Sequence, residues 1–275
     1  HPQAGAKLRR ELYFTPGERP IVAQLFGNQP EKFFQASQLV AELGFAGVDI
    51  NLGCPDQTIV KQGAGAALIN EPALVKEIIL ATKEGAGHLP VSLKTRLGYH
   101  QLDYLPWLSE LLSCRPAVIT VHLRTKKEMS LVPAHWEVVP DLVKLFAGSG
   151  VLLVANGDVG SLAQARQLAE QHQLAGVMLG RAIFGRPYLF AETEPILSPA
   201  ERATLMLQHL NLFADLYLPG PTNDRLFAGH TKSLALLKKH FNLFCENTWC
   251  EKRNEVVNQS KQIYWKRYQK TESCK

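Results

Sequence analysis

Residues 21–51 read IVAQLFGNQPEKFFQASQLVAELGFAGVDIN and contain two short apolar runs on either side of a helical pattern. Between the runs, apolar side chains recur every three or four residues, which predicts a helix that ends near Gly44. The runs at 21–26 and 48–51 are short and rich in apolar residues, as is typical of buried strands. A strand, a helix and a second strand in succession predict a parallel βαβ unit.

The same order of elements continues downstream. Further strands are predicted at residues 91–96, 118–122, 151–156 and 177–179, and helical patterns occupy residues 70–85 and 161–173. Ser161 and Gln164 form a capping-box start for the second of these helices. The alternation fits both an open doubly wound sheet and a closed barrel, so it does not choose between them.

Polar residues near the strand ends favour the barrel. Such residues come from six different units: Gln24, Asn51, Lys94, His122, Asn156 and Arg181. A barrel gathers residues from many strands at its C-terminal mouth, whereas an open sheet concentrates its site at one switch point. The sequence therefore predicts an α/β fold of the TIM-type (β/α)8 class. Because only six units are found, the first two strands are expected to be missing from this chain.

The strand pattern ends near residue 190. Ser198, Pro199 and Glu201 then give a strong helix start, with a capping serine, a proline at the first helical position and an acidic residue after it. Helical sequence follows to the end of the chain. We expect a catalytic barrel domain over residues 1–190 and a small all-helical domain over residues 195–275.

The composition, 46% hydrophobic and 20% charged, is that of a globular protein with a sizeable core. With no long apolar segment and no signal-peptide order at the N-terminus, a soluble cytoplasmic protein is expected. The five cysteines include no CxxC pair, so neither a disulfide framework nor a metal site is predicted. A cluster of Cys245 and Cys250 near His240 is the weak alternative.

The positive charge is concentrated at the C-terminal end. Residues 230–275 hold ten Lys or Arg against four Glu, a net charge of +6, whereas the whole chain carries +5. One interpretation is a solvated helix face. The other is an RNA-binding surface, since aromatic side chains that can stack on bases are interleaved with the cations: Phe241, Phe244, Trp249, Tyr264, Trp265 and Tyr268.

The segment DINLGCPDQTIVKQGAGAAL, residues 49–68, is the strongest candidate for chemistry. Cys54 lies between Gly53 and Pro55 in a tight turn that follows a predicted strand. A lone cysteine is usually a small buried apolar residue, but this one lies in a loop at the expected catalytic face. Gly63 and Gly65 allow the chain to pass close to a ligand or a helix.

A phosphate site is predicted after the last two strands. The segments NGDV at 156–159 and LGRAIFGRP at 179–187 follow these strands, where barrels commonly bind phosphate through backbone N–H groups and a helix N-terminus. Arg181 would add a charge-assisted hydrogen bond.

The order of these motifs resembles the tRNA-dihydrouridine synthase family. VAQLFG, DINLGCP with GAGAAL, SLKTRLGY, TVHLRT, VANGDV and MLGRAIFGRP occur in the family's order, over roughly residues 18–190. The helical tail resembles the family's tRNA-binding domain more loosely, and the family's first strands, with their APM-like and TEM-like residues, have no counterpart here. The resemblance implies FMN at the barrel mouth and reduction of the uracil C5–C6 bond in tRNA at the expense of NADPH.

The resemblance also implies roles for single residues. Cys54 would donate a proton to C5 while the reduced flavin gives hydride to C6, and a thiol with a pKa near 8.5 can act as an acid at neutral pH. The other implied contacts are Lys94 at the polar edge of the flavin, Gln24 and His122 on the isoalloxazine, Asn156, Gly157, Asp158, Gly180 and Arg181 on the ribityl phosphate, and Asn51 and Arg124 on uracil or a neighbouring phosphate.

Several alternatives stay open. Lys94 and Arg124 could instead pair with Asp49 or Asp158, and His122 could be an interior residue. The chain could be another FMN barrel that acts on a free pyrimidine, such as a dihydroorotate dehydrogenase relative, although a free base needs no basic aromatic tail. It could also be a flavin-free barrel with a Schiff-base Lys94, or a tRNA-binding protein without catalysis.

Overall fold

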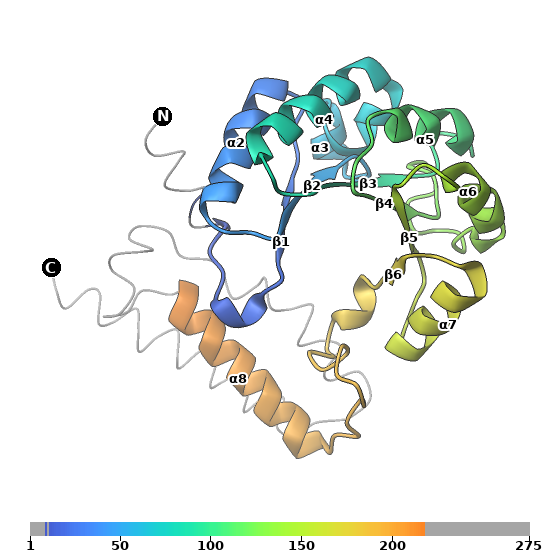
Figure 1. The fold of residues 1–275 in the computed structure, drawn as a ribbon. Coiled ribbons are helices and arrows are strands. Elements are labelled where there is room, and N and C mark those ends of the chain that lie inside the picture. The colour runs from blue at the N-terminus through green and yellow to red at the C-terminus, as the bar shows by residue number, and fades with distance from the viewer. Residues whose placement is uncertain (1–8, 10, 218–275) are drawn as a thin grey trace, which may run out of the picture. The chain divides into compact units, whose positions relative to one another are not determined.

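The computed structural model describes residue 9 and residues 11–217 (Figure 1). The chain divides into two compact units, Leu12–Gly180 and a second unit that comprises His1–Glu11 with Arg181–Lys275. The predicted boundary between residues 190 and 195 stays a prediction. In the described part of the chain, no helix is both long and apolar enough to cross a bilayer.

The first unit is built on one parallel sheet with the strand order β1-β2-β3-β4-β5-β6. Strands that follow one another in the chain are therefore neighbours throughout, as in the wall of a (β/α)8 barrel and unlike a doubly wound sheet, whose order reverses at a switch point. The predicted partial barrel is confirmed. The strands are β1 (Val22–Leu25), β2 (Gly47–Asn51), β3 (Val91–Arg96), β4 (Val118–His122), β5 (Leu152–Asn156) and β6 (Gly176–Met178).

Helices lie along the outer side of the curved sheet (Figure 1). They are α2 (Pro30–Glu42), α3 (Gln57–Lys61), α4 (Pro72–Ala86), α5 (Tyr104–Ser113), α6 (Val139–Phe146) and α7 (Leu162–His172). Short 3-10 helices are η1 (Pro16–Glu18), η2 (Gly65–Asn70) and η3 (Trp136–Val138). The predicted cap is present at α7, where Ser161 Oγ accepts a hydrogen bond from the Gln164 backbone N–H at 3.1 Å.

The core fills the space between this outer side of the sheet and the helices. Alternate strand residues such as Ile50, Leu93 and Ile119 are fully buried there. Because strand side chains alternate between faces, the intervening residues share the opposite, concave face. Two apolar residues of that face, Val22 and Leu152, are 49% and 54% exposed. Five polar residues of the predicted site lie on the same face, nearer the C-terminal ends of the strands: Gln24, Asn51, Lys94, His122 and Asn156.

The second unit contains η4 (Arg181–Ile183) and α8 (Pro199–Tyr217). The predicted capping box is formed at the start of α8, since Ser198 N–H donates to Glu201 Oε2 at 2.8 Å and Glu201 N–H donates to Ser198 Oγ at 3.3 Å. The basic aromatic segment of residues 230–275 lies outside the described residues, and so does most of the predicted helical domain.

Candidate active site

The loop after β2 holds Cys54 in a fixed backbone conformation. Asn51 Oδ1 accepts hydrogen bonds from the N–H groups of Gly53 at 3.1 Å and Cys54 at 2.9 Å. On the other side, the Cys54 carbonyl accepts from the Ala66 N–H at 3.0 Å. Gly65 has φ +60°, and a Cβ there would lie 2.8 Å from the Cys54 carbonyl oxygen. The backbone is therefore constrained on both sides, whereas the free thiol of Cys54 is partly exposed.

Arg96 ties this loop to the loop after β4. Its side chain is 5% exposed, and its Nε donates to the Gly53 carbonyl at 2.7 Å. Its Nη1 donates to the carbonyls of Thr125 at 3.0 Å and Met129 at 2.9 Å. Burial lowers the pKa of Arg96 to about 10, so it stays cationic at neutral pH. Arg96 was not among the predicted site residues, although it lies two residues after Lys94 and therefore on the same face of the strand.

Gln24 and Asn51 are brought together at the ends of neighbouring strands. Asn51 Nδ2 donates to Gln24 Oε1 at 3.0 Å, and Gln24 Nε2 donates to Asp49 Oδ2 at 2.7 Å. Ser92 Oγ donates to the other Asp49 oxygen at 2.6 Å. Burial raises the pKa of Asp49, while these hydrogen bonds and the charge of Lys94 oppose the rise. The chain of bonds fixes the orientation of both amides.

Lys94 is the residue next to Asn51 in the register of β2 and β3. No hydrogen bond or ion pair among the described residues involves its ammonium group, so the predicted alternative of a pair with Asp49 is not observed there. Burial and, to a smaller extent, the positive charge of Arg96 lower the pKa of Lys94 to about 8, while the charge of Asp49 opposes this shift. The half-buried ammonium is suited to an anionic ligand.

The loops after β4 and β5 are joined through Arg124, which is 2% exposed. Its Nη2 pairs with Asp158, its Nε donates to the Val132 carbonyl at 2.6 Å, and its Nη1 lies 3.1 Å from His122 Nε2. The alternative pairing of Arg124 with Asp158 is thus observed. The pKa of His122 falls to about 3 because of burial and the positive charges of Arg96, Lys94 and Arg124. His122 is therefore neutral, and its Nε2 accepts from Arg124.

The predicted phosphate segment begins at the end of β5. Asn156 Nδ2 donates to the Met178 carbonyl at 2.8 Å, and Trp136 Nε1 donates to the Gly157 carbonyl at 3.1 Å. Gly157 has φ +147°, and a Cβ there would lie 2.7 Å from the Cβ of Ala134. Only glycine fits this close approach of the two loops.

The remaining predicted residues are divided between the units. Asp158, with φ +55°, accepts a hydrogen bond from the Ala134 N–H at 2.9 Å besides its pair with Arg124. Gly180 is the last residue of the first unit, and Arg181 opens η4 in the second. Their phosphate contacts stay predictions. No cluster of His, Cys, Asp and Glu among the described residues is arranged to hold a metal ion.

The similarity to known proteins covers most of the chain. The family model described as "Dihydrouridine synthase (Dus)" matches residues 3–269. A Bacillus subtilis (strain 168) protein named "Probable tRNA-dihydrouridine synthase 2" is 43% identical over 215 residues, which are 77% of this chain and 66% of that protein. A "Probable tRNA-dihydrouridine synthase" of Staphylococcus aureus (strain COL) is 41% identical over 216 residues, 78% of this chain and 65% of that protein. The chain thus spans slightly less than two thirds of the length of these relatives.

Among solved structures, similarity is more distant. Histamine dehydrogenase from Rhizobium sp. 4-9 matches with a TM-score of 0.45 and 14% identity, over 58% of this chain and 26% of that chain. The old yellow enzyme homologue from Zymomonas mobilis gives a TM-score of 0.44 and 15% identity, over 74% of this chain and 58% of that chain. The sequence comparisons decide the assignment, and by the extent of the family match the chain belongs to the dihydrouridine synthase (Dus) family.

Proposed function

We propose that this protein reduces specific uridines of tRNA to dihydrouridine, with FMN as cofactor and NADPH as reductant. Besides membership of the family, one structural observation supports this proposal. The partly exposed Cys54 thiol lies on a loop fixed by Asn51 and Arg96, and the Lys94 ammonium, without a recorded partner, lies on the strand beside Asn51. An acid and a cation at the same strand ends suit a reduction that needs a proton and an anionic cofactor.

The residues at these strand ends fit FMN. Lys94 offers a cation for the polar edge of the ring system or for negative charge on it, and the Gln24 and His122 side chains would bind its heteroatoms. Asn156, Gly157, Asp158, Gly180 and Arg181 would bind the phosphate. Because the Asp158 carboxylate pairs with Arg124, its part in phosphate binding would fall to its backbone N–H. When bound, FMN supplies the hydride that adds to C6 of the uracil.

Cys54 holds the proton that completes the reaction. Hydride addition at C6 leaves negative charge over C5 and O4, and the Cys54 thiol donates its proton to C5. C5 is inaccessible within a stacked and folded tRNA, so the uridine must be extruded into the barrel mouth. The clamp of Asn51 and Arg96 on the loop backbone keeps the thiol in position for a base that enters there.

Substrate binding is assigned to Asn51 and Arg124 and to the basic C-terminal segment. Both atoms of the Asn51 amide already have partners, so a further contact with uracil uses the remaining lone pair or N–H. The segment 230–275 carries the charge of +6 and the aromatic residues that suit an RNA backbone and its bases.

The test is NADPH oxidation by the purified protein with unmodified tRNA, with the visible absorbance of the same sample recorded. We expect a flavin spectrum, tRNA-dependent oxidation and dihydrouridine in the recovered tRNA. Free uridine and orotate serve as controls, because a dihydroorotate dehydrogenase-like enzyme would reduce a free pyrimidine. A colourless protein that binds tRNA without oxidising NADPH would contradict the proposal and favour the non-catalytic alternative.

A further inference from the structure

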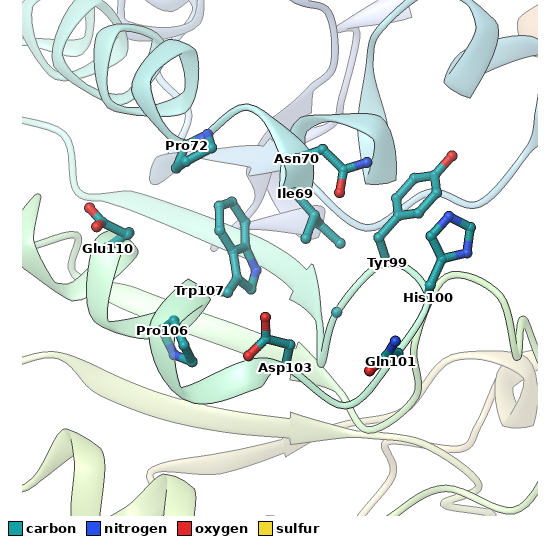
Figure 2. A pocket seen from close by; sticks show the side chains of 11 residues that line it. Ile69, Asn70, Pro72, Tyr99, His100, Gln101, Asp103, Pro106, Trp107 and Glu110 are labelled. Carbon is teal, nitrogen blue, oxygen red and sulfur yellow. The ribbon is translucent and has the colours of Figure 1, made fainter.

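A cavity opens at the same end of the sheet as the candidate active site. It has a volume of about 490 Å³ and lies between the junction of η2 with α4 and the loop that joins β3 to α5 (Figure 2). Gly98, which lines it, follows Arg96 by two residues, and Arg96 holds the loop of Cys54. The cavity therefore belongs to the same end of the sheet as the thiol, although Cys54 is not among its lining residues.

This cavity is lined by aromatic rings and by polar side chains. Tyr99, His100 and Trp107 supply the rings. Trp107 Nε1 donates to Thr95 Oγ1 at 2.9 Å, so the indole offers the cavity apolar ring surface only. Among the described residues, no recorded hydrogen bond involves the polar side-chain atoms of three further lining residues, and all three are exposed: Asn70, Gln101 and Asp103.

The charged residues that line the cavity indicate which class of ligand it can bind. No Lys or Arg lines the cavity, so a phosphate has no counter-charge inside it. Of the two acidic lining residues, Glu110 forms an ion pair with Lys76 at 2.5 Å, which leaves Asp103 as the free carboxylate. Aromatic rings, two amides and one carboxylate are the groups that proteins use to bind an unpaired nucleobase.

We propose that this cavity binds an unpaired base of the RNA substrate, with guanine preferred. Guanine presents two neighbouring N–H donors on its Watson–Crick edge, and a carboxylate accepts both at once. The volume lies within the usual range of about 300 to 1,000 Å³ for small-ligand sites. This inference rests on the proposed function, because it requires RNA at this end of the sheet.

The RNA backbone would pass over the neighbouring loop. Lys126 Nζ lies 4.8 Å from the centroid of the Tyr99 ring, and Lys127 is exposed. The two loops are joined by backbone hydrogen bonds from Lys126 to Gly98 and from Lys127 to Tyr99, both at 2.9 Å. Cations therefore flank the cavity while its interior carries a carboxylate, which suits a nucleotide with its base inside and its phosphate outside.

The first test is ultraviolet cross-linking of unmodified tRNA to the full chain. Trypsin should release Leu97–Arg124 as one peptide, because Arg115 is followed by Pro116. We expect an RNA adduct on Tyr99, His100 or Trp107 within this peptide. Guanosine monophosphate should prevent adduct formation at a lower concentration than inosine monophosphate or uridine monophosphate. In Asp103→Asn this preference for guanosine monophosphate should be lost.

The second test is tRNA binding by variants. Tyr99→Ala should weaken binding about 5-fold to 150-fold, the range of one lost base stack, while Tyr99→Phe should bind like the unaltered protein. Glu170→Gln, which removes an exposed carboxylate on α7, is the matched control for Asp103→Asn. Adducts only at other peptides, together with unchanged binding by Tyr99→Ala and Asp103→Asn, would overturn the inference. Dihydrouridine formation in the same samples reports separately on the proposed function, so an adduct without reduction would support the cavity and refute the enzyme.

Discussion

Cys54 is held in its loop by hydrogen bonds of its own backbone. Asn51 and Ala66 bind the Cys54 N–H and carbonyl, so the side chain can be shortened without loss of these bonds. In Cys54→Ala we expect tRNA reduction to fall by about 10² to 10⁴, the usual cost of a lost general acid. FMN content, read from visible absorbance, should stay unchanged. Normal dihydrouridine formation would remove Cys54 from the mechanism, and loss of flavin would make it a structural residue.

Lys94 should destabilise the flavin-free protein. Its ammonium has no recorded partner and its pKa is lowered to about 8, so Lys94→Met should raise the unfolding free energy by roughly 1 to 2 kcal/mol. The folded-state pKa lies below the unfolded value of 10.5, so this gain is full below about pH 8 and vanishes as the pH rises toward 10.5.

Thermal melting across this pH range measures the stability that Lys94→Met gains without FMN. Melting in the presence of added FMN measures how much the cofactor stabilises each protein. We expect the flavin to stabilise the unaltered protein much more than Lys94→Met, because the variant lacks the cation. Equal stabilisation of both proteins by FMN would show that Lys94 does not contact the cofactor.

At the scale of elements, Gly65 couples η2 to the loop of Cys54. Its φ of +60° is unfavourable for alanine by about 1 to 2 kcal/mol, and the added Cβ would also lie 2.8 Å from the Cys54 carbonyl. Gly65→Ala should therefore lower the melting temperature by several degrees and reduce tRNA turnover. Gly148→Ala is the matched control, because its φ is +71° with nothing within 4 Å of the Cβ. Equal effects of both variants would mean that the Cys54 loop adapts without cost.

The strands were predictable because their signals are local. The bounds of β3 and β4 agree with the predicted 91–96 and 118–122, since β3 is apolar in alternate positions, β4 is a short apolar run, and both end at a loop. The pairing of Arg124 with Asp158 joins residues 34 positions apart, so the sequence could name it only as an alternative. The hydrogen bonds of Arg96 to three carbonyls likewise depend on how two loops fold over β3, and no local pattern specifies them.

At the scale of the whole molecule, the C-terminal charge should govern RNA affinity. Each phosphate contact adds roughly 0.7 to 0.9 to the slope of log affinity against log salt concentration. Replacement of Lys238, Lys239, Lys266 and Arg267 by Gln should flatten this slope. The control removes four exposed cations from the barrel unit: Lys32, Lys61, Lys144 and Arg166. If the control flattened the slope as much, the C-terminal segment would have no special part in tRNA binding.

The order of the described sheet has a consequence for amide hydrogen exchange. β3 and β4 have hydrogen-bonded neighbours on both sides, whereas β1 and β6 each have one neighbour in the described sheet. Local opening should therefore require least free energy at these two edges, and their amides should take up deuterium before those of β3 and β4. Gln24 lies on β1, and the carbonyl that orients Asn156 belongs to Met178 of β6. A bound FMN that contacts both regions should slow exchange at the edges far more than at the centre of the sheet.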